Sequence, residues 1–171
     1  MKRKYLTALT TVIFAAGLLR ADALAQRGVG GPRRGDAQFA TDRDTFHFLL
    51  ANGDKIRRDV KNLPGGVETI TESDDPEVAG KIQEHVAAMY LRVEKPSPIR
   101  MRDPLFAEIF RNADKIDMKV QDTAKGIKAT ETSKDPYVVK LIQEHAKVVS
   151  LFVKHGFDEA HKSHAIPKKQ P

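Results

Sequence analysis

The tetrapeptide Ile-Gln-Glu-His occurs twice in the chain, at residues 82–85 and 142–145. Its two copies contain His85 and His145, two of the six histidines in 171 residues. Imidazole is the commonest side-chain ligand of transition metals and an axial ligand of haem iron. Two histidines that approach each other inside a domain could therefore bind haem b, or contribute to a copper or zinc site.

Further side chains could complete such a site. Met89 follows His85 by one helical turn and offers a thioether that suits copper or haem. His47 is another candidate ligand. Four polar residues that are identical at equivalent positions could accept a ring N–H and orient the imidazoles. They are Asn52, Asp54, Asn112 and Asp114.

A second interpretation needs no ligand. A histidine among apolar residues is commonly a core side chain bonded to a neighbour, and a duplication copies structural and functional residues alike. The chain would then be a structural or protein-interaction domain. The C-terminal segment 156–171 and the residue before it present the same choice. Its histidines, His155, His161 and His164, form either a surface metal site or part of a plain polar tail.

The tetrapeptides belong to an internal duplication. Residues 46–94 align with residues 106–154 at a constant offset of 60 without a gap, and 17 of the 49 aligned pairs are identical. Each copy is predicted to begin with a long helix. In the first copy this helix would start at Thr41 or Asp42 and extend to Leu63, because apolar residues recur at three- and four-residue steps. In the second copy Asp103 is the predicted N-cap.

A second helix is predicted to follow in each copy, after a Gly-containing loop. Asp75 and Asp135 are its expected N-caps, since each precedes a proline at the first helical position. Apolar positions then recur at steps of four, three, four and four. They are Val78, Ile82, His85, Met89 and Val93 in the first copy, and Val138, Ile142, His145, Val149 and Val153 in the second.

These four helices predict an all-α fold, an antiparallel four-helix bundle made of two pseudo-symmetric hairpins. Residues 42–155 would form the bundle, with repeat one at 42–95 and repeat two at 102–155. In such hairpins Gly53 and Ala113 would lie level with the two histidines and leave them space.

The N-terminus is typical of an exported protein. Residues 1–25 have the basic start, apolar middle and Ala23-Leu24-Ala25 ending of a signal peptide, although a retained anchor is the alternative. Removing them leaves 25 basic residues (29 minus 4) and 22 acidic residues (23 minus 1). The Gly- and Arg-rich residues 26–41 are predicted to be disordered. The chain has no cysteine, which excludes disulfides and covalently attached c-type haem.

Enzyme motifs are missing from the sequence, including Glu-x-x-His, His-Glu-x-x-His, Gly-x-Ser-x-Gly and the P-loop. We therefore expect a periplasmic or secreted protein that is not an enzyme. It would bind haem b, copper or zinc for electron transfer, sensing or metal carriage, with a redox or metal-exchange protein as partner. A homodimer is compatible with the sequence, whereas nucleic acid and a membrane span after signal cleavage are not expected.

Overall fold

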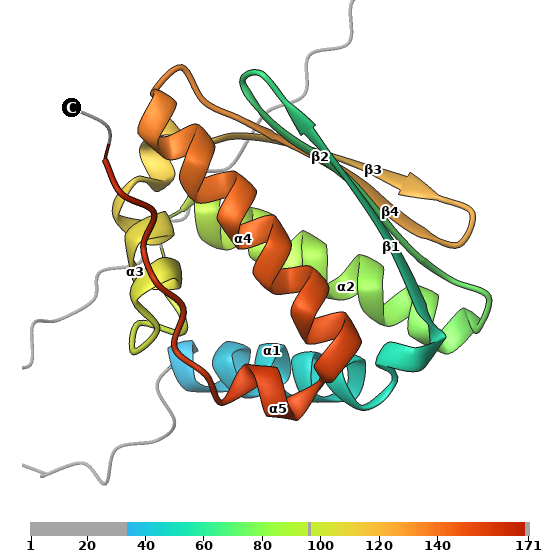
Figure 1. The fold of residues 1–171 in the computed structure, drawn as a ribbon. Helices are drawn as coiled ribbons and strands as arrows, with labels where there is room; N and C mark the ends of the chain where they lie inside the picture. Colours follow the sequence, from blue (N-terminus) through green and yellow to red (C-terminus); the bar gives the residue numbers. More distant parts are fainter. Residues whose placement is uncertain (1–33, 96, 170–171) are drawn as a thin grey trace, which may run out of the picture. The chain divides into compact units, whose positions relative to one another are not determined.

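The computed structural model describes residues 34–95 and 97–169, and Figure 1 shows their arrangement. The predicted signal peptide and residues 26–33 lie outside the described residues. The helical elements are α1 (Arg34–Ala51), η1 (Gly53–Lys55), α2 (Pro76–Glu94), α3 (Pro104–Arg111), η2 (Ala113–Lys115), α4 (Pro136–His155) and α5 (Phe157–Ala160). The strands are β1 (Ile56–Leu63), β2 (Gly66–Ser73), β3 (Asp117–Thr123) and β4 (Gly126–Thr132).

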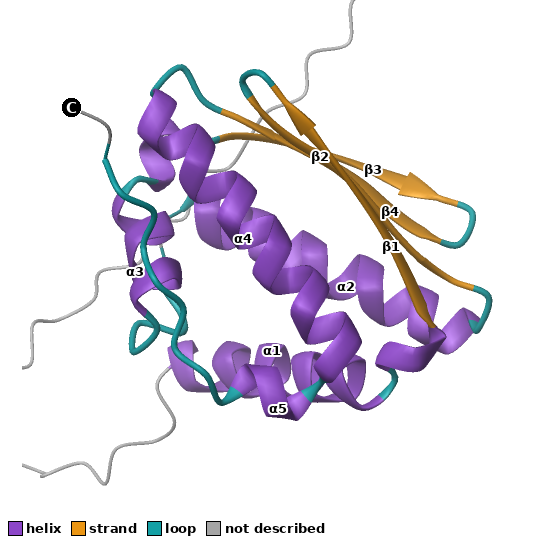
Figure 2. Ribbon diagram, in the orientation of Figure 1, coloured by secondary structure: helices purple, strands orange, loops and turns teal. Residues whose placement is uncertain are grey.

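The prediction of an all-α four-helix bundle is wrong, because each repeat contains a β-hairpin between its helices. The first helix of repeat one ends at Ala51, and the residues predicted to continue it form β1. Alternation explains the difference. Ile56 and Val60 fit helical spacing, but they also lie an even number of residues apart and so share one face of a strand. The chain is an α/β protein, and both repeats have the order α-β-β-α (Figure 2).

The two hairpins join into one antiparallel sheet with the strand order β1-β2-β4-β3. Its centre is the pairing of β2 with β4, in which Thr69 lies opposite Ala129. These two residues are 60 positions apart and are therefore equivalent in the repeats. The pseudo-two-fold axis consequently passes between them, and the duplication seen in the sequence is also a symmetry of the sheet.

Gly66 and Gly126 are identical in the alignment because the central strands approach closely. A Cβ atom at Gly66 would lie 1.9 Å from the carbonyl oxygen of Glu131, and one at Gly126 would lie 2.1 Å from that of Thr71. No side chain fits at either position. Glycine at the start of each hairpin's second strand is therefore a requirement for joining the two hairpins.

The predicted caps of three helices are confirmed. The Asp75, Asp103 and Asp135 carboxylates each accept a hydrogen bond from a main-chain N–H in the first turn, before a proline at the first helical position. In contrast, α1 begins at Arg34, within the segment predicted to be disordered, so that Thr41 and Asp42 lie inside the helix. The Asp42 carboxylate is buried there and accepts a hydrogen bond of 2.6 Å from Arg92 Nε of α2.

The helices lie on one side of the sheet, with α2 and α4 between the sheet and the helices α1 and α3 (Figure 1). Two small apolar clusters are equivalent in the repeats. One contains Val78, Ile82 and Ile127, and the other Val138, Ile142 and Val67. A larger central cluster joins α1, α3 and α4 and is asymmetric, because Leu141 and Phe152 correspond to Lys81 and Arg92 in the first repeat.

The other side of the sheet has a polar character. Side chains that point away from the helices include Glu68 and Lys128, which form an ion pair of 2.9 Å across β2 and β4. Among the described residues, no helix is long and apolar enough to cross a membrane.

Candidate functional site

The structure assigns a separate role to each residue of the repeated tetrapeptide. Ile82 and Ile142 are buried in the two equivalent apolar clusters. Glu84 and Glu144 point outwards and pair with Lys81 at 2.7 Å and Lys147 at 2.6 Å. The first residue therefore packs the core and the third serves the surface.

The two glutamines connect the repeats. Gln143 Nε2 of repeat two donates to the carbonyl oxygens of Leu63 (3.1 Å) and Gly66 (3.0 Å), which flank the β1–β2 turn of repeat one. Gln83 makes the equivalent contacts with the β3–β4 turn, at 3.0 Å and 3.4 Å. Each amide thus satisfies main-chain carbonyls that a turn would leave without an internal donor. This exchange is a structural reason for the glutamine in both copies.

The histidines pack against equivalent phenylalanines. The His85 ring is stacked on Phe46 with a centroid separation of 5.8 Å, and the His145 ring meets the edge of Phe106 at 5.2 Å. Phe152 lies between the two phenylalanines, 5.6 Å from Phe46 and 5.8 Å from Phe106. A row of three phenylalanine rings therefore has an imidazole at each end.

Burial keeps both imidazoles neutral at neutral pH. It lowers the pKa of His85 to about 4 and that of His145 to about 4, and the positive charge of Arg58 lowers the pKa of His145 further. In each ring Nδ1 is inaccessible to solvent and has no hydrogen-bond partner among the described residues. Both side chains thus behave as uncharged core residues with one unsatisfied nitrogen.

Arg58 and Glu131 add two ionisable groups to the helix-facing side of the sheet, and the sequence analysis missed them. Arg58 donates to the Thr71 hydroxyl, while its Nε is buried without a partner. Burial lowers its pKa to about 10, and burial raises the pKa of Glu131 to about 7 against the opposing charge of Arg58. Strand alternation would have placed both residues inward, but the helical prediction for residues 56–63 hid it.

The other predicted site residues lie apart from the imidazoles in their bonding. The side-chain amides of Asn52 and Asn112 donate to carbonyl oxygens of Phe48 and Glu108 at the ends of α1 and α3, at 2.9 Å each. The remaining predicted residues of repeat one and two are exposed or half-buried. Asp54, Asp114 and His47 are exposed, and Met89 is half-buried.

Gly53 has a packing role that the bundle model did not predict. A Cβ atom at this position would lie 2.2 Å from the Val153 carbonyl oxygen, so the glycine lets η1 approach the end of α4. Ala113, its equivalent, is buried. The space predicted opposite the histidines is therefore used by main-chain packing in repeat one.

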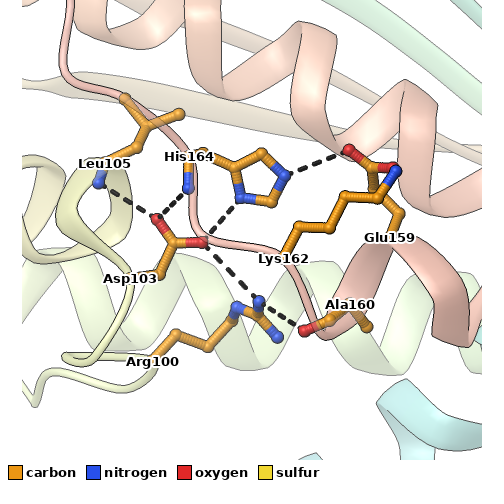
Figure 3. Close-up of polar contacts among 7 residues, drawn as sticks. All are labelled: Arg100, Asp103, Leu105, Glu159, Ala160, Lys162 and His164. Atoms are coloured by element: carbon orange, nitrogen blue, oxygen red, sulfur yellow. Dashed lines mark hydrogen bonds and ion pairs between the residues drawn. The ribbon is translucent and has the colours of Figure 1, made fainter.

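The C-terminal histidines have different surroundings. His155 and His161 are exposed. The ring of His164 is buried between two carboxylates, with Nδ1 2.6 Å from Asp103 and Nε2 3.2 Å from Glu159 (Figure 3). Such a pair of acceptors favours a ring that donates from both nitrogens, which is the imidazolium form. His164 thereby attaches the tail to α3 and α5.

Arg100 extends this network. Its guanidinium donates to the Ala160 carbonyl oxygen at 3.1 Å, lies 3.7 Å from Asp103, and stands 5.0 Å from the ring centroids of Phe106 and Phe152 (Figure 3). Such cation–π contacts stabilise a partly buried guanidinium. Within residues 34–95 and 97–169, no group of three or more His, Asp or Glu side chains is placed to bind a metal ion.

A groove of about 410 Å³ lies at one end of the sheet, where the β1–β2 turn meets the first turns of α4. Its apolar wall includes Leu63, Pro64 and Val139. Lys134 and Lys140 also line it, and neither lysine forms an ion pair within the described part of the chain. The groove is thus an open surface site with uncompensated positive charge.

Comparison of the chain with protein-family models, with curated proteins and with solved structures finds no match. The arguments about function therefore rest on the geometry of the interior and of the groove.

Proposed function

We propose that the chain is an exported protein-interaction domain, in which the repeated histidines build the interior and a partner binds at the surface. The signal-like residues 1–25 support export. The stacking of His85 and His145 on phenylalanines supports the interior role, because each ring fills the core in its neutral form.

The groove beside the β1–β2 turn carries the proposal. It has a size typical of binding sites and combines an apolar wall with two unpaired lysines. A lysine left without a counter-charge contributes little to the stability of its own domain, whereas it attracts and orients a charged partner. Such a surface is suited to recognition.

Binding of haem b, copper or zinc by His85 and His145 stays an untested prediction. The contacts around the rings favour the core role, since Phe46 and Phe106 pack directly against them. The cavity that touches His85 has a volume of about 40 Å³, room for only about one to three water molecules.

Site-specific crosslinking in the native host tests the proposal. A photoreactive amino acid at Pro64, which is exposed in the groove, should crosslink to a defined partner protein. The same amino acid at the exposed Lys154, at the other end of α4, is the matched control. Equal crosslinking from both positions, or none from Pro64, would contradict the proposal.

A further inference from the structure

We propose that the groove binds an extended acidic segment of a partner protein. This inference rests on the proposed function and adds the chemical class of the partner. Residues of the groove are far apart in sequence, with Leu63, Pro64 and Gly65 on one side and residues 133–143 on the other. The site is therefore a product of the fold and was not visible in the sequence.

The groove is preformed. Main-chain and side-chain hydrogen bonds tie its two sides together, from Ser133 N to the Gly65 carbonyl oxygen at 2.9 Å and from Gln143 to the carbonyl oxygens of Leu63 and Gly66 at 3.1 and 3.0 Å. A binding surface that is already ordered does not lose conformational entropy when the partner arrives. The tetrapeptide glutamine thus contributes indirectly to the groove.

The charge of the groove follows from a difference between the repeats. At the equivalent end of repeat one, the Asp74 carboxylate pairs with Lys125 at 2.6 Å and with Arg57. In repeat two, Lys134 replaces Asp74 and Gly65 replaces Lys125. The ion pairs that cross the surface at one end are therefore absent at the other, where Lys134 and Lys140 face the groove without a carboxylate.

Two lysines beside an apolar wall define the complementary ligand. A carboxylate can pair with each lysine, and an apolar side chain between the carboxylates can contact Leu63, Pro64 or Val139. An extended peptide presents such side chains at intervals of about 3.3 Å per residue. The expected ligand is a segment of aspartate and glutamate residues that flank an apolar residue.

A second copy of this chain is a less suitable occupant. Its acidic turn at the equivalent end contains Asp74 and Asp75, and both carboxylates already form ion pairs within their own chain. Binding to another copy would require those pairs to be exchanged, whereas an unpaired acidic segment of a partner gains new ones.

Fluorescence anisotropy with labelled peptides tests the inference on the purified full domain. We expect an acidic peptide with a central leucine to bind, with an affinity that falls as salt rises. The double substitution Lys134→Glu and Lys140→Glu should weaken binding at least about tenfold, which corresponds to about 1.4 kcal/mol. Lys154→Glu, an exposed lysine elsewhere on α4, is the matched charge control and should leave the affinity unchanged.

A groove-filling variant tests the location without changing the charge. Gly65→Phe should fold, because a Cβ atom at this glycine meets no atom closer than the Ser133 carbonyl oxygen at 3.9 Å. Its ring should then block the peptide. Circular dichroism and the unfolding midpoint verify the fold of each variant.

The outcomes separate this inference from the proposed function. Equal binding of an acidic peptide and its Asn/Gln counterpart, or unchanged binding by the Lys134→Glu, Lys140→Glu variant, overturns the inference. Absence of peptide binding together with a partner crosslinked at Pro64 overturns the acidic class and leaves the interaction function intact. A dimer that forms at rising concentration, that this double substitution abolishes, and that occurs without peptide binding makes a second copy the occupant and also overturns the inference.

Discussion

Mild acid should destabilise the domain through its two buried histidines. Burial lowers the pKa of His85 and His145 from the ordinary 6.5 to about 4. Between these values the unfolded chain binds more protons than the folded domain. The contribution to stability is therefore complete above pH 6.5 and is lost as the pH falls towards about 4. Glu131 acts in the opposite direction, because burial raises its pKa from 4.5 to about 7.

These shifts give a magnitude for each group. Between about pH 7 and pH 4.5, each histidine removes about 2.4 kcal/mol from the free energy of unfolding, and Glu131 adds about 2.6 kcal/mol. The wild-type domain should thus lose about 2 kcal/mol on acidification. These are upper values, since the rings of His85 and His145 are half-buried and retain some contact with solvent.

Three variants separate the contributions. The Glu131→Gln variant should lose about 5 kcal/mol over the same range, because the opposing group is gone. The double variant His85→Leu, His145→Leu should instead gain about 3 kcal/mol on acidification. His161→Leu, which removes an exposed histidine, should behave like the wild type.

Urea unfolding followed by far-ultraviolet circular dichroism at the two pH values, at constant ionic strength, measures these differences. The sign of the pH effect is the critical result. If the double histidine variant loses as much stability in acid as the wild type, the imidazoles are not the buried neutral groups described above, and the reasoning fails.

Two further predictions concern contacts between elements. Gln83→Met should lower the free energy of unfolding by about 1–2 kcal/mol, because two turn carbonyls lose their donor; urea unfolding measures this, and Gln121→Met on an exposed strand position is the control. His164→Gln should lower stability by about 3 kcal/mol and speed carboxypeptidase trimming of the tail, since it breaks a buried pair with Asp103, whereas His161→Gln should change neither.

The duplication and the starts of three helices were predictable from the sequence. Asp75, Asp103 and Asp135 act locally, since each carboxylate caps the helix that begins directly after it. The offset of 60 residues likewise survives in the fold as the pseudo-symmetry of the sheet. Signals that depend only on neighbouring residues were therefore reliable.

The β-hairpins were missed because residues 56–63 satisfy two periodicities. Ile56, Val60 and Leu63 fit helical spacing, and the exposed Arg57, Asp59 and Lys61 would fit the outer face of either element. Pairing with β2 decides the outcome, since it satisfies the main-chain groups of both strands. The threonines and valine of residues 67–71 were the available signal, as these residue types favour strands.

The site was less predictable than the fold. His85 and His145 do face inward, but the partners of their rings, Phe46 and Phe106, come from other helices and depend on tertiary packing. The groove could not be foreseen, because its lysines become neighbours of the β1–β2 turn only when the two repeats pair.

The most direct test of the account is to repeat crosslinking at Pro64 in the double variant His85→Leu, His145→Leu. We predict the same partner and the same yield as in the wild-type background, because the histidines serve the interior and the groove binds the partner. Loss of that crosslink in a double variant that remains folded, with the crosslink retained in the Lys134→Glu, Lys140→Glu variant, would contradict the account and assign the function to the histidines.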